Sequence, residues 1–253
     1  MLYFYTVTTP EQSHLCDTLK KSLARFGYDL TILPLYENNN FSKLKISSFL
    51  ESTLYNNNDF IVICDGFDVV CASNPEKIID FFTEHNDTDI LISSENMFGN
   101  NMVCIKDYYD RYNEKNGTTG KYLNSGVVMG RANKIKQFYK QLVSCTSTLR
   151  DYYIPPDRRD TTGDQTYIIN YLYHIDFVNY KDIKIQIDIH DKLTFTNTII
   201  NRPFNARDYI FIHTWGIYIK DPNYKYIRDQ QYKKWSDINS ELELWRGWWI
   251  III

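Results

Sequence analysis

Apolar and polar residues follow two different periods along the first part of the chain. Four short apolar runs are typical of strands in a buried sheet, at 2–7, 29–35, 60–64 and 89–93. Between them lie three stretches in which apolar residues recur every three or four positions, as on one face of a helix, at 11–26, 43–55 and 74–85. Because strands and helices alternate, we expect an α/β fold with a mostly parallel central sheet and helices on both faces.

The second half of the chain continues this pattern after a polar, loop-like stretch over 96–122. Further strands are predicted at 122–130, near 184–189 and near 208–213, and further helices at 133–149 and 163–173. The helix over 74–85 has the clearest start, because an N-cap, a proline and an acid follow one another in Asn74, Pro75 and Glu76. No internal repeat or low-complexity linker interrupts the sequence, so we expect a single domain over 1–253.

Composition narrows the class of protein. Of the 253 residues, 43% are hydrophobic and 23% are charged, which is ordinary for a soluble globular chain. The net charge of −3 indicates no general attraction to nucleic acid or to an anionic membrane. The five cysteines are scattered without C-x-x-C spacing, so neither a zinc site nor a disulfide framework is indicated.

The two ends of the chain bear on its location. The first residues, Met-Leu-Tyr-Phe-Tyr-Thr-Val, lack the basic segment and apolar length of a secretion signal, so we expect a cytoplasmic protein. The run Trp-Arg-Gly-Trp-Trp-Ile-Ile-Ile-Ile at 245–253 is strongly apolar but too short to span a bilayer. We therefore expect no membrane span, and a tail that packs on the domain or forms a homodimer contact.

The most informative segment is Asp59-Phe-Ile-Val-Ile-Cys-Asp-Gly-Phe-Asp at 59–68. A buried strand runs straight into two carboxylates, Asp65 and Asp68, and Gly66 between them lets the chain turn so that both acids converge. Two hard oxygen ligands at the carboxyl end of a buried strand suit Mg²⁺ or Mn²⁺, which typically bridge a protein to phosphates. The alternative is that one Asp caps the next helix and the other is solvated.

Four further blocks are informative when taken together: ICDGFDVVCASNPEKIIDFF (63–82), ILISSEN (90–96), GKYLNSGVVMG (120–130) and GDQTYIINYLY (163–173). In this order they resemble the glycosyltransferase domain of the procollagen lysyl hydroxylase family, a nucleotide-sugar transferase of the GT-A type. The late strand that ends at His213 resembles the family's strand with its third metal ligand. The resemblance implies a GT-A fold with a nucleotide-binding half (1–95), a half for donor sugar and acceptor (96–220), and a C-terminal extension (221–253).

The resemblance also implies an activity. It indicates a Mn²⁺-dependent, retaining hexosyltransferase that moves glucose from UDP-glucose to hydroxylysine or galactosylhydroxylysine of a collagen-like protein. Asp65, Asp68 and His213 would hold the metal, and the imidazole favours Mn²⁺ over Mg²⁺. For His213 the alternative is a hydrogen-bonded histidine in the core or at the surface.

Further positions match the family's donor site. By resemblance, Thr6, Val7, Thr8 and Lys45 hold the uridine and diphosphate, Lys220 contacts phosphate, and Trp215 with Gly216 follows the metal ligand beside the sugar. Asn124, Asp164 and Gln165 lie where donor sugar and acceptor meet, with Asp164 and Asn124 as the catalytic candidates. Each has a simpler alternative: Asp164 as a helix N-cap, Asn124 as a ligand of turn backbone, Trp215 as a core residue, and Lys45 as a solvated helix residue. Glu95 is a weaker candidate.

The chain departs from the family near the sugar and the acceptor. The family's run of aspartates before Asp164 is here Thr161-Thr162-Gly163, and its G-N-G after the histidine is here Thr214-Trp215-Gly216. Two other functions therefore stay open: a transferase that uses UDP-galactose or another acceptor, and a catalytically inactive UDP- or carbohydrate-binding domain. A composition rich in Ile, Asn, Tyr and Lys, typical of AT-rich genomes, together with the resemblance suggests a viral or microbial enzyme acting in an infected host cell or virion.

Overall fold

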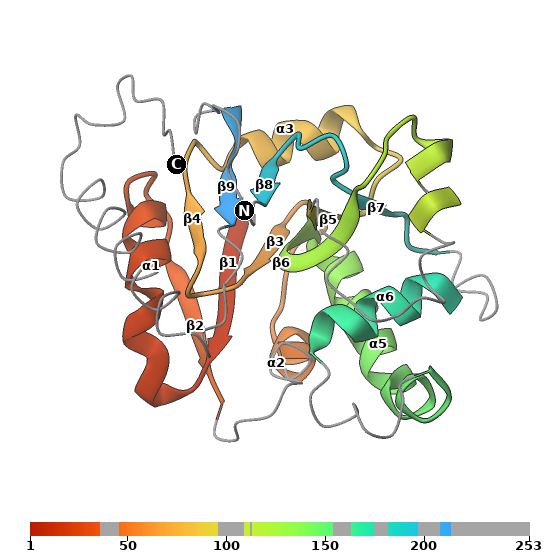
Figure 1. Ribbon diagram of the computed structural model, residues 1–253. Coiled ribbons are helices and arrows are strands. Elements are labelled where there is room, and N and C mark those ends of the chain that lie inside the picture. The colour runs from red at the N-terminus through yellow and green to blue at the C-terminus, as the bar shows by residue number, and fades with distance from the viewer. Residues whose placement is uncertain are drawn as a thin grey trace, which may run out of the picture.

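A computed structural model describes residues 1–35, 46–95, 109–111, 113–153, 163–174, 182–196 and 208–213. Its main feature is a six-stranded sheet with the order β2-β1-β3-β6-β5-β7 (Figure 1). The strands of this sheet are β1 (Leu2–Thr8), β2 (Leu30–Pro34), β3 (Phe60–Cys64), β5 (Ile90–Glu95), β6 (Tyr122–Arg131) and β7 (Ile185–Ile187). Strand β6 runs antiparallel to its neighbours β3 and β5, and the other neighbouring pairs are parallel. The expected mostly parallel sheet is confirmed.

Helices cover both faces of this sheet, as expected. They are α1 (Asp17–Ala24), α2 (Ile46–Ser52), α3 (Lys77–Glu84), α5 (Ala132–Tyr153) and α6 (Asp164–His174). Strand β3 shows how the faces divide, because all five of its residues are buried. Its side chains alternate between two cores: Ile61 and Ile63 pack in the core shared with α2, α5 and α6, and Val62 and Cys64 pack in the core shared with α1 and α3. A sheet buried on both faces needs such uninterrupted apolar strands.

Two expected helix starts are wrong in detail. The predicted helix over 11–26 is a 3-10 helix over Pro10–Cys16 followed by α1, because Ser13 Oγ donates to Pro10 O and the His14 ring bonds Glu11 O, which favours the tighter turn. Helix α3 begins at Lys77 rather than at Pro75. Asn74 still acts as a cap, but for the preceding turn, because its Oδ1 accepts the Glu76 N–H at 3.1 Å.

Some short elements escaped the hydrophobic pattern. Residues 109–111 and 113–115 are helical where a loop was expected. Strands β4 (Val69–Cys71) and β8 (Thr194–Thr196) join β9 (Phe211–His213) in a three-stranded sheet with the order β4-β9-β8. Each of these strands has only three residues, too few to show a period.

Asp188 holds the turn that leads into β8. Its carboxylate accepts the backbone N–H groups of Lys192, Leu193 and Thr194 and the Thr194 hydroxyl, at 2.7 to 3.0 Å. Burial raises the pKa of Asp188, and these hydrogen bonds oppose the rise. Strand β8 then lies parallel to β9 with Thr196 beside His213, so this buried acid helps to place the end of β9.

Several predicted features lie outside the described residues. They are Lys45 and the first residues of the predicted helix over 43–55, the residues Trp215, Gly216 and Lys220, and the C-terminal extension 221–253. None of the helices in the described ranges is long and apolar enough to cross a membrane.

Candidate metal centre

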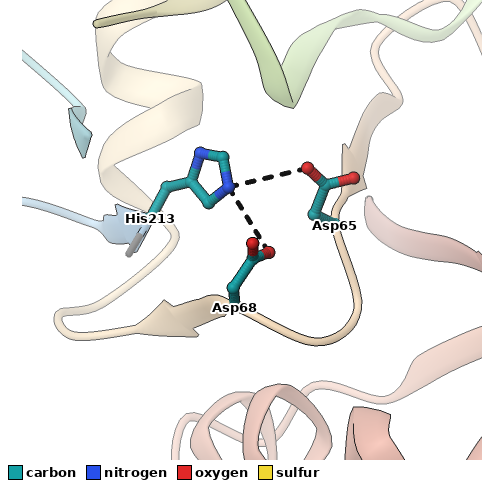
Figure 2. A group of neighbouring side chains, drawn as sticks. All are labelled: Asp65, Asp68 and His213. Atoms are coloured by element: carbon teal, nitrogen blue, oxygen red, sulfur yellow. Dashed lines mark ion pairs between the residues drawn. The ribbon is translucent and has the colours of Figure 1, made fainter. Parts of the chain in front are cut away.

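Two side chains from the loop between β3 and β4 and a third from the end of β9 converge beyond the carboxyl end of β3. Asp65 follows the last residue of β3, Asp68 precedes β4, and His213 is the last residue of β9. Figure 2 shows the imidazole pointing between the two carboxylates. The Nε2 atom of His213 lies 3.3 Å from Asp68 Oδ1 and 3.6 Å from Asp65 Oδ2. One ligand atom from each residue lies within 4.8 Å of the other two.

The strand pairing explains this convergence. Strand β4 pairs antiparallel with β9, and the first residue of β4, Val69, is directly opposite His213. Asp68 therefore reaches the end of β9 although 145 positions separate the two residues (213 − 68). Asp65 is held from the other side, because its backbone N–H donates to Gly126 O at 2.7 Å. The expected convergence of the two acids is thus present, and His213, which the resemblance placed with them, joins from a distant strand.

Gly66 allows this arrangement for a different reason from the one expected. It is not among the described glycines with positive φ, so the turn does not require left-handed backbone. A Cβ at this position would instead lie 2.5 Å from Cys16 Sγ and 2.8 Å from Thr6 Oγ1. Glycine is needed because the loop packs tightly against β1 and the N-terminal 3-10 helix.

The three groups fit a divalent cation. Two carboxylates and one imidazole are a hard-oxygen set with one borderline nitrogen, which suits Mn²⁺ and related ions. Ligand atoms of an octahedral ion with bonds of about 2.1 Å lie roughly 3 Å apart along each edge, close to the separations seen around His213 Nε2. His213 is 2% exposed, whereas the Asp65 side chain is 36% exposed, so the group is open on the Asp65 side. A cation bound there would keep open positions toward solvent or a ligand.

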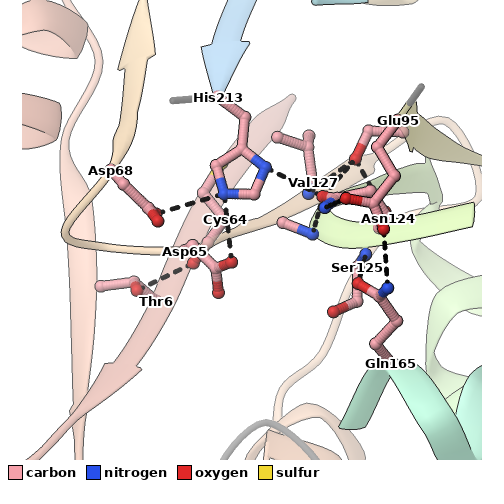
Figure 3. A network of polar contacts seen from close by, with 12 residues as sticks. Thr6, Cys64, Asp65, Asp68, Glu95, Asn124, Ser125, Val127, Gln165 and His213 are labelled. Atoms are coloured by element: carbon pink, nitrogen blue, oxygen red, sulfur yellow. Dashed lines mark hydrogen bonds and ion pairs between the residues drawn. The ribbon is translucent and has the colours of Figure 1, made fainter. Parts of the chain in front are cut away.

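A buried polar network continues from His213 toward α6 (Figure 3). His213 Nδ1 contacts Asn124 Oδ1 at 2.9 Å, and Asn124 Nδ2 donates to Glu95 Oε2 at 3.3 Å. Gln165 Nε2 donates to Glu95 Oε1 at 2.9 Å, and Gln165 Oε1 accepts the Ser125 N–H at 3.1 Å. The structure therefore brings together two predicted site residues, Asn124 and Gln165, around Glu95.

Glu95 has a larger part in this network than its sequence suggested. It is the last residue of β5 and is 2% exposed. Burial raises its pKa, and the hydrogen bonds from Gln165 and Asn124 and the nearby His213 oppose that rise. A carboxylate at the end of a buried strand, the signal that marked Asp65, was also present here.

Asp164 begins helix α6 as its first residue, and it is partly buried. It therefore lies in the first turn of the helix and not at the N-cap position before it. In the first turn its negative charge is favourable, because it is close to the positive end of the helix dipole. Its catalytic role stays a prediction.

The predicted nucleotide residues Thr6, Val7 and Thr8 end strand β1, which lies beside β3. The Thr6 hydroxyl donates to Cys64 O at 2.9 Å, so this side chain ties the two strand ends together. The Thr8 hydroxyl is buried and has no hydrogen-bond partner among the described residues. Nucleotide contact by these residues stays a prediction, as it does for Lys45, Trp215, Gly216 and Lys220, which the structure does not describe.

A known family matches more than half of this chain. The family model of the PLOD GT domain, the glycosyltransferase domain of lysyl hydroxylases, matches residues 1–151. The chain belongs to the PLOD GT domain family. The matched part contains Asp65, Asp68, Glu95 and Asn124. Gln165 and His213 of this GT domain lie after the matched part.

Solved structures agree on the fold of this GT domain. A glycosyltransferase involved in the glycosylation of the major capsid of PBCV-1 is 14% identical, with a TM-score of 0.55 over 92% of this chain and 98% of that one. The glycosyltransferase GlyE of Streptococcus pneumoniae TIGR4 is 12% identical, with a TM-score of 0.51 over 95% of this chain and 63% of that one. An active-site mutant of LgtC is 9% identical, with a TM-score of 0.51 over 98% of this chain and 99% of that one.

No curated protein sequence compared with the chain gave a significant match. The family match and these structures confirm the expected family and the GT-A fold. The protein is a glycosyltransferase.

Proposed function

We propose that this domain transfers a hexose from a UDP-hexose, with UDP-glucose as the donor, to hydroxylysine or galactosylhydroxylysine of a collagen-like protein, and that it needs Mn²⁺. The observation that carries the proposal is the meeting of Asp65, Asp68 and His213 at one point beyond β3. Ligands of α/β sheets bind outside the carboxyl ends of strands, which is where this point lies. Membership of the PLOD GT domain family supports glycosyl transfer as the reaction.

The cation would neutralise charge on the diphosphate as the bond from the sugar to UDP breaks. Asp65, Asp68 and His213 would hold the ion, and the exposure of Asp65 would leave it accessible to the diphosphate of the donor. The two carboxylates supply the charge that retains a divalent ion, and the imidazole favours Mn²⁺ over Mg²⁺. Thr6, Val7 and Thr8 end the neighbouring strand β1, and we assign them to the uridine.

Asp164 is the residue we assign to the acceptor. It begins α6 directly before Gln165, whose amide bonds Glu95 and the Ser125 backbone. A transfer that retains the configuration of the sugar needs acid–base help near the anomeric carbon, and a carboxylate beside the donor can orient the attacking hydroxyl.

A donor screen tests the proposal. UDP release and product formation would be measured with UDP-glucose and UDP-galactose, on peptides bearing hydroxylysine or galactosylhydroxylysine, with Mn²⁺, with Mg²⁺ and with a chelator. We expect transfer from UDP-glucose in Mn²⁺ and loss of transfer on chelation. Preference for UDP-galactose would replace the donor in the proposal.

Two double variants with the same change of charge test whether Asp65 and Asp68 hold the metal. Asp65→Asn/Asp68→Asn should abolish transfer, whereas Asp17→Asn/Asp87→Asn makes the same charge change at two exposed carboxylates and should leave it intact. The shortened acidic stretch before Asp164 favours one other function, a domain that binds UDP or carbohydrate without catalysis. UDP binding with no product on any acceptor would establish that function and overturn transfer.

A further inference from the structure

The amide of Asn124 has a defined orientation in the buried network. The backbone N–H of Gly126 lies 2.8 Å from Asn124 Oδ1, and because a backbone N–H can only donate, the atom that it contacts must be the amide oxygen. At the other end, Asn124 Nδ2 faces Glu95 Oε2 at 3.3 Å, and an ionised carboxylate can only accept. Both neighbours therefore select the same orientation of the amide.

This orientation determines the tautomer of His213. Asn124 Oδ1 is an acceptor, so the ring nitrogen 2.9 Å from it, Nδ1, must carry the proton. In the neutral ring the lone pair is then on Nε2, the atom that faces Asp68 at 3.3 Å and Asp65 at 3.6 Å. The lone pair points to the place where we put the cation.

Glu95 is held in turn by helix α6. Gln165 Nε2 donates to Glu95 Oε1 at 2.9 Å, while Gln165 Oε1 accepts the Ser125 N–H at 3.1 Å. Since the Ser125 N–H is also an obligatory donor, the orientation of the Gln165 amide is set in the same way as that of Asn124. Glu95 thus receives one N–H from each of two amides, an arrangement that suits an ionised carboxylate because both of its oxygens accept.

An irregularity in β6 brings Asn124 into this position. Between two register points β5 advances two residues, from Ile92 to Ser94, while β6 advances five, from Leu123 to Val128. The extra residues of β6 leave the ladder with β5. Ser93 fixes them, because its hydroxyl donates to Asn124 O at 2.8 Å and accepts the Val127 N–H at 3.2 Å. Such bulges commonly re-aim a side chain next to a functional site.

We infer that Asn124 and Glu95 are positioning residues that hold His213 in the tautomer required of a metal ligand. The inference rests on the proposed function for the cation, and it assigns Asn124 a task other than contact with the donor sugar. The Asn124 side chain fits this task because it is 1% exposed and its oxygen is already shared by Gly126 and His213. Metal-binding histidines are generally oriented by a partner on the other ring nitrogen, and loss of that partner typically costs about 10- to 100-fold in metal affinity.

The tautomer can be measured without metal, nucleotide or activity. The full chain labelled with ¹⁵N at histidine would be recorded in metal-free buffer at a pH where the ¹⁵N shifts show the His213 ring to be neutral, with His213→Gln to assign the signals. We expect the Nδ1-protonated tautomer in the wild type and a shift toward the Nε2-protonated form in Asn124→Ala. An Nε2-protonated ring in the wild type would overturn the inference.

Mn²⁺ binding by calorimetry is the second readout. Asn124→Ala should weaken Mn²⁺ binding about 10- to 100-fold. Glu95→Gln should weaken it in the same direction, because the neutral amide has one oxygen for two N–H donors and turns its own N–H toward the other. The control is Asn170→Ala, a buried asparagine of α6 that bonds Thr166 O, which should lower stability without changing the tautomer or the Mn²⁺ affinity.

The outcomes separate this inference from the proposed function. An unchanged tautomer and Mn²⁺ affinity in Asn124→Ala would overturn the inference and leave transfer standing. A raised donor KM at saturating Mn²⁺ with unchanged Mn²⁺ affinity would also overturn it, in favour of a sugar contact. Absence of any Mn²⁺ binding in the wild type would overturn the proposed function and the ligand role of His213 together, whatever the tautomer.

Discussion

The imidazole of His213 lies directly over the Cα of Gly126. A Cβ added at this position would overlap the Cε1 and Nδ1 atoms of the ring and would lie 2.8 Å from Asn124 Oδ1. The glycine is therefore required by the close approach of the ring from β9 to β6. This contact explains why the sequence Leu-Asn-Ser-Gly at 123–126 ends in glycine, since the same four residues supply the partner of His213 and the space for its ring.

Gly126→Ala should displace His213 and so impair the candidate metal centre. We expect Mn²⁺ affinity to fall at least about tenfold, because the ring can no longer hold its place against Asn124. The free energy of unfolding should fall by about 1–3 kcal/mol, as is usual when a methyl group is forced into a packed interior. Calorimetric titration with Mn²⁺ and urea unfolding measure the two effects.

Gly130→Ala is the matched control for this variant. It lies on the same strand, and its Cβ would overlap Asp89 O rather than any residue of the metal centre. We expect a comparable loss of stability with unchanged Mn²⁺ affinity of the folded protein. Wild-type Mn²⁺ affinity in Gly126→Ala would contradict the proposed position of the ring.

The two threonines at the end of β1 should respond differently to replacement by valine. Thr6→Val removes the donor to Cys64 O and should lower the free energy of unfolding by about 1 kcal/mol. Thr8→Val removes a hydroxyl without a partner in the described part of the chain, so stability should change by less than about 0.5 kcal/mol.

If Thr8 holds the nucleotide, Thr8→Val should also bind UDP about fivefold more weakly. This factor is equivalent to roughly 1 kcal/mol for one lost hydrogen bond. Thermal unfolding and calorimetry with UDP separate the two effects. Unaltered UDP binding by Thr8→Val would remove Thr8 from the nucleotide site.

The buried Glu95 should make stability depend on pH in a defined direction. Its pKa in the folded protein is raised above the ordinary value, chiefly by burial. Between the ordinary and the raised pKa the folded state binds more protons than the unfolded state, so the contribution of Glu95 to stability falls as pH rises through that window.

Glu95→Gln cannot titrate at this position, whereas Asp188 and the other buried acids are common to both proteins. The free energy of unfolding of the wild type minus that of the variant should therefore decrease as pH rises from about 4 through the raised pKa. Urea unfolding of the metal-free proteins over a pH series measures this difference. A difference that stays constant or grows with pH would show that Glu95 is not destabilised by its burial.

Local patterns predicted much of the fold and part of the site. The alternation of apolar runs and helical periods identified the buried strand β3, and with it Asp65 and Asp68. The position of a carboxylate directly after an apolar strand is a short-range signal that a single sequence contains. The family resemblance added His213, Asn124 and Gln165.

The contacts among these residues depend on pairings that no local pattern reveals. Asp68 reaches His213 through the pairing of β4 with β9, two strands of three residues each. Asn124 reaches the ring because β6 leaves its register with β5, which is decided by hydrogen bonds of Ser93 and not by hydrophobicity. The contacts of Glu95 depend on this second arrangement and on helix α6, so the sequence indicated the residue only as a weaker candidate.

The most direct test of the central claim is Mn²⁺ binding to the wild type and to Asp65→Asn/Asp68→Asn, measured by calorimetry with and without UDP. We predict one Mn²⁺ site in the wild type that tightens when UDP is present, no such site in this double variant, and wild-type binding in Asp17→Asn/Asp87→Asn. Equal Mn²⁺ binding by the wild type and the Asp65→Asn/Asp68→Asn protein would contradict the claim that these carboxylates and His213 hold the cation.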